Sequence, residues 1–469
     1  MPFSGFPFLL GFLPLVLCGY ALAGRWGEAT AKIWLIAVSL LFYGAGAPAF
    51  LPLLLLSLGV NFLLLHAVYG SSRAEQWTQA GIMLNLAVLV WFKYLDGTAV
   101  LGLSFFTFTQ ILCLLHHAGG DAKPPLLRDY ILYAAFFPAL LAGPILNPHE
   151  MLPQFARREG WRLTADNLAV GSGFFIIGLL KKTLLADPLS TVVVPAFADP
   201  VCLTLFPAWQ AAAAYSLQLY FDFSGYTDMA IGLAWMVGLR FPDNFDQPYR
   251  ANSVIAYWQR WHMSLTRFLM TTVHAPLTLA ILRSRKRRGQ RIDAAAQATF
   301  GGFLIMIGLP VLVTMLLVSL WHGATLPFLL FGSLHTVCLL VNHAWRLIRW
   351  PALPVPVNVT LTYFCVLLGA VLFRAATAGA AGSVLAGMAG LHGIGAIQAD
   401  IWVTIEVLWL AALYGVVWLV PSTRQWMLQY PTGRPVWRQT QGWAVVMGCA
   451  GTLGLLAAGG TREFLYFQF

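Results

Sequence analysis

The chain has 469 residues, of which 59% are hydrophobic and only 10% are charged. Soluble domains carry about 25% charged residues, so this composition excludes a soluble globular protein. Backbone polar groups in lipid must be satisfied internally, which predicts an all-α polytopic membrane protein. The formal net charge of +10 does not indicate a nucleic-acid partner, because there is no soluble basic domain to bind one and the basic residues of membrane proteins first determine orientation.

The N-terminal third predicts a series of membrane helices. Residues 1–24 lack the basic start of a cleaved signal peptide and are interpreted as a retained first span. Residues 33–70 are too long for one span, and the Gly-Ala-Gly-Ala-Pro stretch that ends at Pro48 divides them into two helices. Further helices are predicted at 80–94 and 101–117, the second with Ser, Thr and Gln side chains suited to packing inside the bundle or to a re-entrant segment.

Residues 131–148 contain Pro138, Gly143 and Pro144, which interrupt a regular helix. Broken backbone at membrane depth is tolerated only where protein or a water-filled cavity covers it. The segment is therefore either a kinked structural helix or part of a cavity lining. A further helix is predicted from Asp166 to Lys182, with charges at its two ends that suit the helix dipole.

Residues 220–269 concentrate acids, amides, arginines and a histidine in a chain that otherwise has few of them. Asp222 and Asp228, with Ser224 between them, place carboxylates in or beside the membrane, where an unpaired acid is costly. We expect these residues to accept hydrogen bonds from the segment that follows, for example from Arg250 or backbone amides, and so to hold the site together. A proton or ion pathway is the alternative. The acids and amides at 243–247 lie in a proline-bounded loop and resemble a metal site only superficially.

His262 lies in an aromatic segment, residues 257–263. If this segment is one helix, Trp258, His262 and Leu265 share a face, because residues three and four apart are neighbours. His262 would then point into the bundle, and Arg260 toward headgroups or an anionic cytosolic ligand. The segment is interpreted either as an aromatic-anchored interfacial helix or as the carrier of a second catalytic or donor-positioning histidine.

His322 lies in a turn between two apolar segments. The basic run at 283–288 predicts that this loop faces the cytoplasm, which places the turn at the far end of a helical hairpin. Trp321 can shield the imidazole from water, and Gly323 allows a substrate to approach closely. A lone histidine in an apolar setting is more often structural, but an imidazole with a pKa of ~6.5 can also accept and return a proton.

The second half of the chain contains four apolar runs that are long enough to span a bilayer. They lie at 300–320, 355–373, 401–420 and 442–460.

The remaining histidines and the cysteines show no comparable pattern. His335 and His343 are expected to pack or hydrogen-bond within the next helix, and His116 and His117 form a pair without other metal ligands. The six cysteines show no CxxC spacing and are interpreted as small buried apolar residues rather than as metal ligands or disulfides. Residues 374–400 predict a loop with a short surface helix.

Three stretches carry a family resemblance: DFSGYTDMAIG at 222–232, NFDQPYRANSVIAYWQRWHMSL at 244–265 and LWHGA at 320–324. They resemble the bacterial polysaccharide-modifying branch of the membrane-bound O-acyltransferase family, which includes alginate and cellulose acetylation proteins and teichoic-acid D-alanylation proteins. Shorter similar elements are SFFTF at 104–108, FFPALLAGPI at 136–145, LFRA at 372–375 and LYFQF at 465–469. The resemblance implies a single acyltransferase domain over residues 1–469, built as a ring of about 10–12 transmembrane helices with re-entrant and interfacial helices.

By this resemblance His322 is the catalytic histidine and His262 is the second invariant one. The substrate-binding or site-supporting residues are then Trp321, Asp222, Ser224, Asp228, Trp258, Arg260 and Trp261. The implied reaction is acyl transfer from a thioester, expected to be acetyl-CoA, to an exopolysaccharide such as cellulose or alginate, in the bacterial inner membrane and without a bound cofactor or metal. The implied partners are membrane lipids and a periplasmic or membrane-anchored acetyltransferase with a serine-hydrolase-like domain.

One departure from the family pattern follows His262. The family commonly continues with a Trp, then Arg-Asp-Tyr and a PLGG-like stretch, whereas this chain has TRFLMTTVHAPL at 266–277 and keeps only Pro276 and Leu277 of it. A cellulose or other exopolysaccharide system is therefore at least as plausible as an alginate system. Outside this enzyme class, the broken helices and buried acids also fit a transporter or polymer-export channel, although paired inverted repeats are not evident. A noncatalytic scaffold of a polysaccharide secretion complex is the third alternative.

Overall fold

The computed structural model describes residues 1–201, 203–395, 401–428, 437–458 and 464–465, with the backbone alone for 401–404. The chain divides into two compact units. Among the described residues, unit 1 comprises those of Met1–Leu184, Asp222–Asp243 and Thr423–Gln468, and unit 2 comprises those of Leu185–Phe221 and Asn244–Ser422. Helix α11 (Leu205–Met236) contributes residues to both units.

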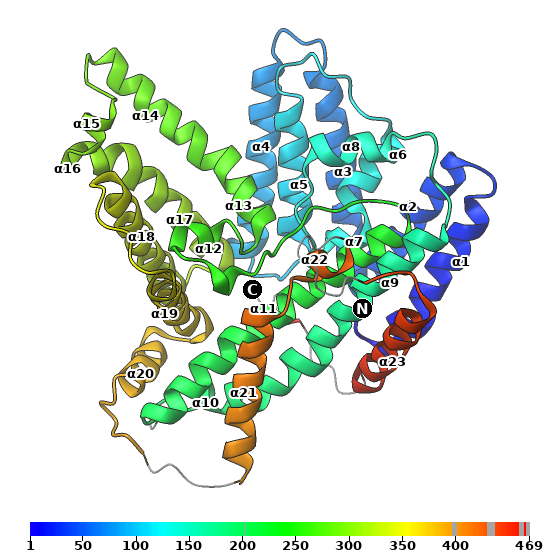
Figure 1. The fold of residues 1–469 in the computed structure, drawn as a ribbon. Coiled ribbons are helices and arrows are strands. Elements are labelled where there is room, and N and C mark those ends of the chain that lie inside the picture. Colours follow the sequence, from blue (N-terminus) through cyan, green and yellow to red (C-terminus); the bar gives the residue numbers. More distant parts are fainter. Residues whose placement is uncertain (202, 396–400, 429–436, 459–463, 466–469) are drawn as a thin grey trace. The chain divides into compact units, whose positions relative to one another are not determined.

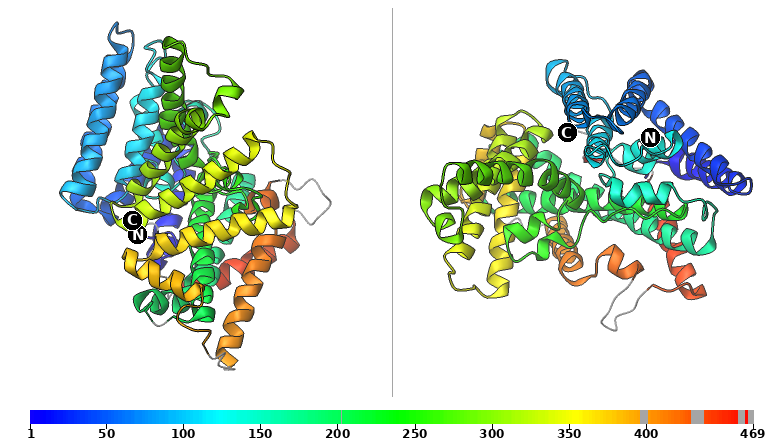
Figure 2. Two further views of the ribbon diagram at one scale, coloured as in Figure 1. Left: turned by 90° about the vertical axis from the view of Figure 1, so that its left-hand side faces the viewer. Right: turned by 90° about the horizontal axis from the view of Figure 1, so that it is seen from above.

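Unit 1 contains the N-terminal helices, the second part of α11 and two C-terminal helices (Figure 1). Within this unit α3 packs against α4, α4 against α5, and α2 against α6; the paired helices α3 and α4 are also visible in Figure 2. Apart from α11, the helices of this unit are α1 (Leu13–Ala23), α2 (Glu28–Gly46), α3 (Leu51–Val68), α4 (Ala74–Val90), α5 (Leu103–His116), α6 (Leu127–Ala135), α7 (Phe137–Leu140), α8 (Pro148–Phe155), α9 (Ala165–Leu180), α22 (Thr423–Met427) and α23 (Gln441–Ala457).

Unit 2 contains the first part of α11 and the segments that carry both predicted histidines. Its long apolar helices α17, α18 and α19 pack against one another in succession (Figure 1). The helices of this unit are α10 (Ser190–Ala198), α12 (Val254–Trp258), α13 (Met263–Leu269), α14 (Ala275–Arg287), α15 (Ala294–Gln297), α16 (Phe300–Phe303), α17 (Leu309–His322), α18 (Leu326–Leu347), α19 (Val355–Arg374), α20 (Ala378–Met388) and α21 (Ile401–Leu419).

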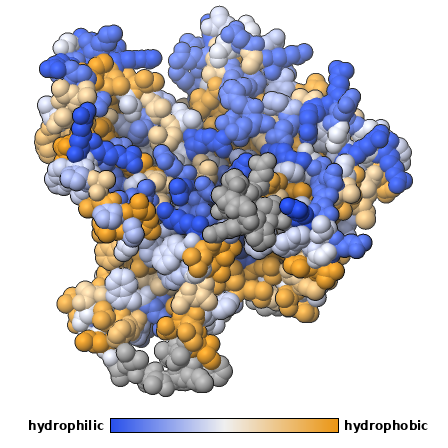
Figure 3. Space-filling model, viewed as in Figure 1, coloured by the Kyte–Doolittle hydropathy of each residue, from blue (hydrophilic) through white to orange (hydrophobic). Residues whose placement is uncertain are grey.

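Eight helical segments among the described residues are long and apolar enough to cross a membrane. They are Glu28–Gly46, Pro48–Val68, Ala74–Leu95, Ala165–Ala198, Met263–Arg287, Phe300–His322, Leu326–Leu347 and Val355–Arg374. The described residues form no β-strand, so the predicted all-α polytopic membrane fold is confirmed. Hydrophobic side chains cover broad areas of the surface in Figure 3, as is typical of helices that face lipid, and hydrophilic ones gather around the end of α14.

The predicted breaks in the N-terminal part are confirmed. Helix α2 ends at Gly46, and a 3₁₀ turn at Pro48–Phe50 precedes α3, because proline at 48 cannot continue the preceding helix. Helix α5 carries buried Thr107, Thr109 and Gln110, as expected for a segment packed inside the protein. The broken segment near Pro138 forms two short helices, α6 and α7, which are buried along most of their length.

Helices α9 and α11 cross at glycines. A Cβ atom added at Gly178 would lie 2.5 Å from the backbone oxygen of Gly225, and one added at Gly225 would lie 2.8 Å from the backbone oxygen of Gly178. Gly171 and Gly232 make the same reciprocal contact, at 2.6 and 2.5 Å. Small residues let membrane helices approach backbone to backbone. This crossing brings the lysine-bearing end of α9 beside the carboxylates of α11.

We expect Gly178→Ala to lower the stability of the protein by about 1–3 kcal/mol, because the added methyl group would overlap backbone atoms that no side-chain rotation can move away. Gly448→Ala in α23 is the matched control, since its Cβ would meet no atom within 4 Å and alanine favours a helix by up to ~1 kcal/mol. Melting temperatures of the purified proteins in detergent check this prediction. An unchanged melting temperature for Gly178→Ala would contradict the tight crossing.

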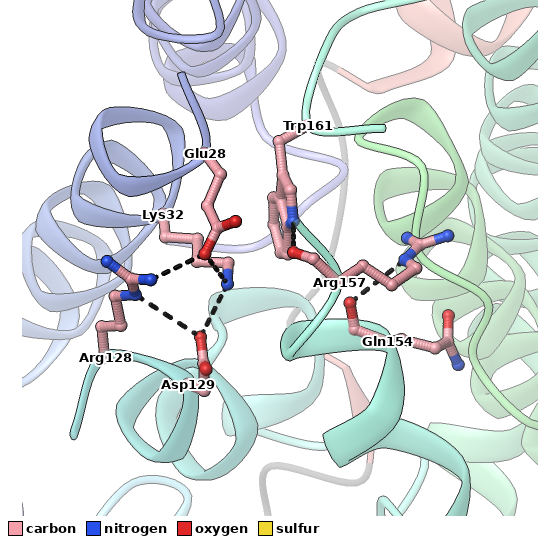
Figure 4. Close-up of polar contacts among 7 residues, drawn as sticks. All are labelled: Glu28, Lys32, Arg128, Asp129, Gln154, Arg157 and Trp161. Carbon is pink, nitrogen blue, oxygen red and sulfur yellow. Dashed lines mark hydrogen bonds and ion pairs between the residues drawn. The ribbon is translucent and has the colours of Figure 1, made fainter. Parts of the chain in front are cut away.

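A partly buried cluster of four charged residues joins α2 to α6 in unit 1 (Figure 4). Lys32, fully buried, donates to Glu28 Oε1 at 3.0 Å and to Asp129 Oδ1 at 2.9 Å. Arg128 donates to the same Glu28 oxygen at 2.7 Å, and the Lys32 ammonium lies 4.9 Å from the ring centroid of Trp161. Two cations and two anions neutralise one another, which offsets the large desolvation penalty of a buried charge. The positions of these four residues in the sequence gave no indication of this cluster.

The segment after α8 carries Arg157 and Trp161, which Figure 4 also shows. Arg157 donates through Nη2 to the carbonyl oxygen of Gly238 at 2.9 Å and through Nε to that of Gln154 at 3.2 Å. The indole of Trp161 donates to the carbonyl oxygen of Arg157 at 2.7 Å. The bond from Arg157 to Gly238 ties this segment to the residues that directly follow α11 within unit 1.

The interpretation of the cysteines as buried residues is correct only in part. Cys113 is buried, and Cys338 and Cys365 are half-buried against an apolar cluster around Met315. Cys18 and Cys449 are exposed, because the outer surface of a membrane helix is itself apolar and accepts such a residue. Cys202 lies outside the described residues.

Candidate active site

His322 ends a membrane helix in unit 2. It is the last residue of α17, and α18 begins at Leu326. Gly323 is extended (φ 167°, ψ 151°), so the chain leaves the helix at once. The imidazole is 8% exposed and is followed by exposed residues at 324–326. The predicted position of this histidine, at a break between two apolar helices, is confirmed.

Aromatic rings surround the His322 imidazole. The ring centroid of Trp321 lies 4.5 Å from that of His322, and Phe373 of α19 contacts it edge-to-face at 4.7 Å. Phe328 of α18 stacks at 6.0 Å. Three apolar rings on one imidazole leave little room for water, and exclusion of water strengthens polar interactions with a reacting group.

His262 has a left-handed backbone (φ 44°, ψ 52°), which is uncommon for a residue other than glycine. Helix α12 ends at Trp258, and α13 begins at Met263, directly after His262. The prediction of one helix that carries Trp258, His262 and Leu265 on a single face is therefore wrong. The side chain is buried, at 1% exposed, as predicted for a residue that points into the bundle.

Asn244 explains why the chain reverses at His262 instead of continuing as a helix. Its backbone carbonyl accepts the N–H of Met263 at 3.0 Å, and its side-chain Oδ1 accepts the N–H of Ser264 at 3.1 Å and the Oγ–H of Ser264 at 2.9 Å. The first N–H groups of a helix have no partner within it, so Asn244 caps α13 from a distant loop. The same Oδ1 lies 3.2 Å from Nδ1 of His262.

The burial of His262 affects its protonation. The residue lies just before the membrane-spanning segment Met263–Arg287. Burial lowers the pKa of His262 below its usual range, because desolvation disfavours the imidazolium. The ring is therefore neutral near pH 7, and one of its two nitrogens carries a lone pair that can accept a proton or a hydrogen bond.

Trp321 joins the two histidines. Its ring centroid lies 6.1 Å from that of His262 and 4.5 Å from that of His322. The structure thus brings together three predicted site residues from two separate motifs, all within unit 2.

The other predicted residues of the His262 motif have supporting contacts. Trp258 donates its indole N–H to Nδ1 of His335 at 3.3 Å, which confirms the hydrogen-bonding role predicted for His335. Trp261 stacks on Tyr257, with ring centroids 5.8 Å apart. Arg260 is half-buried, and its carbonyl oxygen accepts the N–H of Asp246 at 3.0 Å.

The acidic residues form buried ion pairs in unit 1. Asp222 accepts from Nζ of Lys182 at 2.6 Å and from the backbone N–H of Leu465 at 2.9 Å. Asp228 accepts from Lys181 at 2.6 Å and from the hydroxyl of Thr423 at 2.6 Å.

These donors come from other parts of the chain than we predicted. They lie before and far after the acids, whereas Arg250 donates to the carbonyl oxygens of Val417 and Val420 at 3.0 and 2.7 Å within unit 2. Ser224 is buried, and its hydroxyl has no hydrogen-bond partner among the residues that the structure describes. The acids and Ser224 belong to unit 1 and the two histidines to unit 2.

Sequence reasoning missed three residues that hold these groups. The sequence pattern explains Lys181 and Lys182 only as basic residues at a favourable helix end. Two acids six residues apart in an apolar region need two cations, however. This need for counter-charges could have indicated that the two lysines pair with Asp222 and Asp228. Asn244 was assigned to a loop without a role, and no spacing rule connects it to His262.

The histidine pair on α5 has a neighbour that we did not predict. Nδ1 of His116 lies 3.1 Å from Nε2 of His149, which belongs to α8. Within the described part of the chain, however, no group of three His, Cys, Asp or Glu side chains could hold a metal ion.

Comparison with known proteins identifies the family. The family model of the membrane-bound O-acyltransferases matches residues 50–292. A peptidoglycan O-acetyltransferase of Helicobacter pylori is 31% identical over 439 residues, which cover 82% of this chain and 79% of that protein. A probable alginate O-acetylase AlgI of Pseudomonas putida is 34% identical over 406 residues, which cover 80% of this chain and 77% of that protein. A teichoic acid D-alanyltransferase of Streptococcus thermophilus is 23% identical over 291 residues, covering 59% of this chain and 66% of that protein.

The relatives with 31% and 34% identity align with most of the chain, including the segment that ends in His322, whereas the family model stops before it. The names of these relatives and the helical membrane fold agree with the family that the three sequence motifs resemble. The chain therefore belongs to the membrane-bound O-acyltransferase family and is a multi-pass membrane O-acetyltransferase.

Proposed function

We propose that this enzyme takes an acetyl group from acetyl-CoA and transfers it to a hydroxyl group for the O-acetylation of an extracellular polysaccharide, with His322 as the catalytic base. The observation that carries this proposal is the arrangement of His262, Trp321 and His322, which places two imidazoles around one indole ring. His322 lies at a helix end beside an exposed turn, so a substrate can reach it. The aromatic rings around the imidazole shield it from water. General base catalysis benefits from both properties.

The proposed chemistry is a single acyl transfer. The hydroxyl oxygen of the acceptor forms a C–O bond to the thioester carbonyl carbon, and His322 takes the hydroxyl proton. The C–S bond breaks, and the imidazolium returns this proton to the departing thiolate, so that an ester and a free thiol result. His262 acts as a second proton acceptor or as a positioning group that accepts a hydrogen bond from the bound substrate.

The final acceptor is proposed to be a carbohydrate polymer. Relatives with more than 30% identity are named for peptidoglycan and for alginate. The departure from the family pattern at 266–277 keeps cellulose among the candidates. The basic residues at the end of α14 support a cytoplasmic position for that loop and therefore insertion in the inner membrane with the donor side inward.

The donor assignment is tested with purified protein, acetyl-CoA labelled in the acetyl group and the serine-hydrolase-like partner protein as the first acceptor. We expect loss of the thioester together with one free thiol for each acetyl group transferred. If the thioester persists while a carrier-protein thioester is consumed, the acetyl-CoA assignment is wrong. If neither is consumed and polymer crosses the membrane, the chain would act as an exporter instead.

We further propose that the acetyl group passes to a periplasmic or membrane-anchored partner with a serine-hydrolase-like domain, which docks near the exposed turn after His322. The described segments that are not apolar helices are short, so little of them could form a long polymer-binding groove. In vesicles with acetyl-CoA on the cytoplasmic side and polysaccharide outside, we expect polymer acetylation only when the partner is added. Efficient polymer acetylation by this chain alone would contradict the relay but not the acyltransferase reaction.

A further inference from the structure

We infer that Asn244 is the positioning residue of His262, which it holds in the tautomer with hydrogen on Nδ1 so that Nε2 is the accepting nitrogen. This inference rests on the proposed role of His262 in acyl transfer. It concerns a loop residue that the sequence motifs left without a function.

The identity of the Asn244 atom that faces His262 follows from hydrogen-bond chemistry. A backbone N–H can only donate, and the N–H of Ser264 points at the Asn244 side chain at 3.1 Å. The atom that it meets must therefore be the amide oxygen and not the amide nitrogen. The Oγ–H of Ser264 donates to the same atom at 2.9 Å.

The tautomer of His262 then follows from the same oxygen. Nδ1 of His262 lies 3.2 Å from Oδ1 of Asn244, and a carbonyl oxygen has no proton to donate. Nδ1 must carry the hydrogen, and in a neutral imidazole the lone pair is then on Nε2. Burial of His262 keeps the ring neutral, so this distinction between its two nitrogens persists near pH 7.

Asn244 also fixes the backbone from which the ring projects. Its carbonyl oxygen accepts the N–H of Met263 at 3.0 Å, and together with Oδ1 it satisfies the first two N–H groups of α13. These bonds stabilise the left-handed conformation of His262 (φ 44°), which a non-glycine residue adopts only when its surroundings compensate the strain. One buried residue, 1% exposed, thus sets both the direction and the tautomer of the imidazole, and the ring so directed lies against Trp321.

The test uses three variants of the full-length protein. Asn244→Leu keeps the volume but removes the acceptor oxygen. Asn244→Asp keeps an acceptor oxygen toward both Ser264 and His262. Ser264→Ala removes one donor to Oδ1 but leaves the backbone N–H of residue 264 and the bond to His262, so it serves as the control for general loosening of the loop.

The first measurement is the ¹⁵N NMR spectrum of histidine-labelled protein, with the His262 signals assigned by their absence in His262→Gln. We expect the Nδ1–H tautomer of His262 in the wild type and in Ser264→Ala. In Asn244→Asp we also expect a hydrogen on Nδ1. We expect a mixture of tautomers or the Nε2–H form in Asn244→Leu. An Nε2–H form in the wild type would overturn the inference, whether or not Asn244→Leu folds.

The second measurement is steady-state acyl transfer. Asn244→Leu should lower kcat by about 10- to 100-fold with little change in KM, which corresponds to the loss of one buried hydrogen bond at the reacting group. Asn244→Asp should recover most of this loss, and Ser264→Ala should remain near wild type. Wild-type kcat in a folded Asn244→Leu protein would overturn the positioning role.

The two measurements separate this inference from the proposed function. If the NMR spectra agree with the expectation but His262→Gln retains wild-type kcat, the tautomer assignment holds and the role of His262 in transfer is wrong. If His262→Gln is inactive and Asn244→Leu alters neither the spectrum nor kcat, the inference about Asn244 is wrong and the proposed function stands.

Discussion

Replacing His322 with alanine is expected to reduce acyl transfer by ~10²-fold or more, the usual contribution of a general base, and to eliminate detectable turnover in most assays. The yield of inserted protein should change little, because the residue lies at the end of α17 beside an exposed turn and its removal takes away a polar group rather than core volume. The measurement is the rate of thiol release from the acyl donor, at equal amounts of folded protein. Retained turnover would remove His322 from the catalytic role.

His343→Ala is the matched control for this experiment. His343 lies in the adjacent helix α18 and is half-buried, so the variant tests the loss of an imidazole from the same hairpin without touching the ring cluster around Trp321. We expect near-wild-type activity. A comparable loss in both variants would indicate that histidine removal disturbs the hairpin rather than the chemistry.

Replacing Lys182 with methionine is expected to have the largest effect on stability. The Lys182 side chain is 1% exposed and pairs at 2.6 Å with Asp222, whose side chain is 2% exposed. Removing one partner of a buried ion pair leaves a desolvated charge and typically costs about 3–5 kcal/mol. The ammonium also lies 4.6 Å from the ring centroid of Phe464, so the described C-terminal residues should loosen as well. The melting temperature and the fraction of monodisperse protein in detergent measure this effect.

Two further variants make this prediction specific. Lys182→Met combined with Asp222→Asn should recover part of the lost stability, because the amide needs no counter-charge and can still accept the N–H of Leu465, which now bonds Asp222 at 2.9 Å. Arg291→Met removes one partner of an exposed pair with Asp293 and should have little effect, since solvent screens surface ion pairs. If the double variant were no more stable than Lys182→Met, the uncompensated charge would not be the cause.

The C-terminal motif illustrates how far the sequence alone could go. The resemblance of LYFQF at 465–469 to an element of the family gave no contact for these residues. The structure places the N–H of Leu465 on Asp222 and buries Phe464 against Tyr226, with ring centroids 4.7 Å apart. The remaining residues of the motif lie outside the described residues.

The sequence by itself determined the membrane fold, the breaks at Pro48 and after His322, and the family. These features are local: long apolar runs form spanning helices, and Pro or Gly ends them. The two histidine motifs were likewise recognisable, because each is a run of consecutive residues.

Only the tertiary structure decided how the site is held together. The left-handed turn at His262 depends on Asn244. The group of aromatic side chains around His322 includes Phe373, which belongs to another helix. The pairing of Lys182 with Asp222 depends on the close crossing of α9 and α11 at their glycines. Each of these contacts joins residues from separate elements, so no periodicity within one element could reveal it. Local helix propensity would have continued α12 through His262, but the capping hydrogen bonds from a distant loop were stronger than that preference.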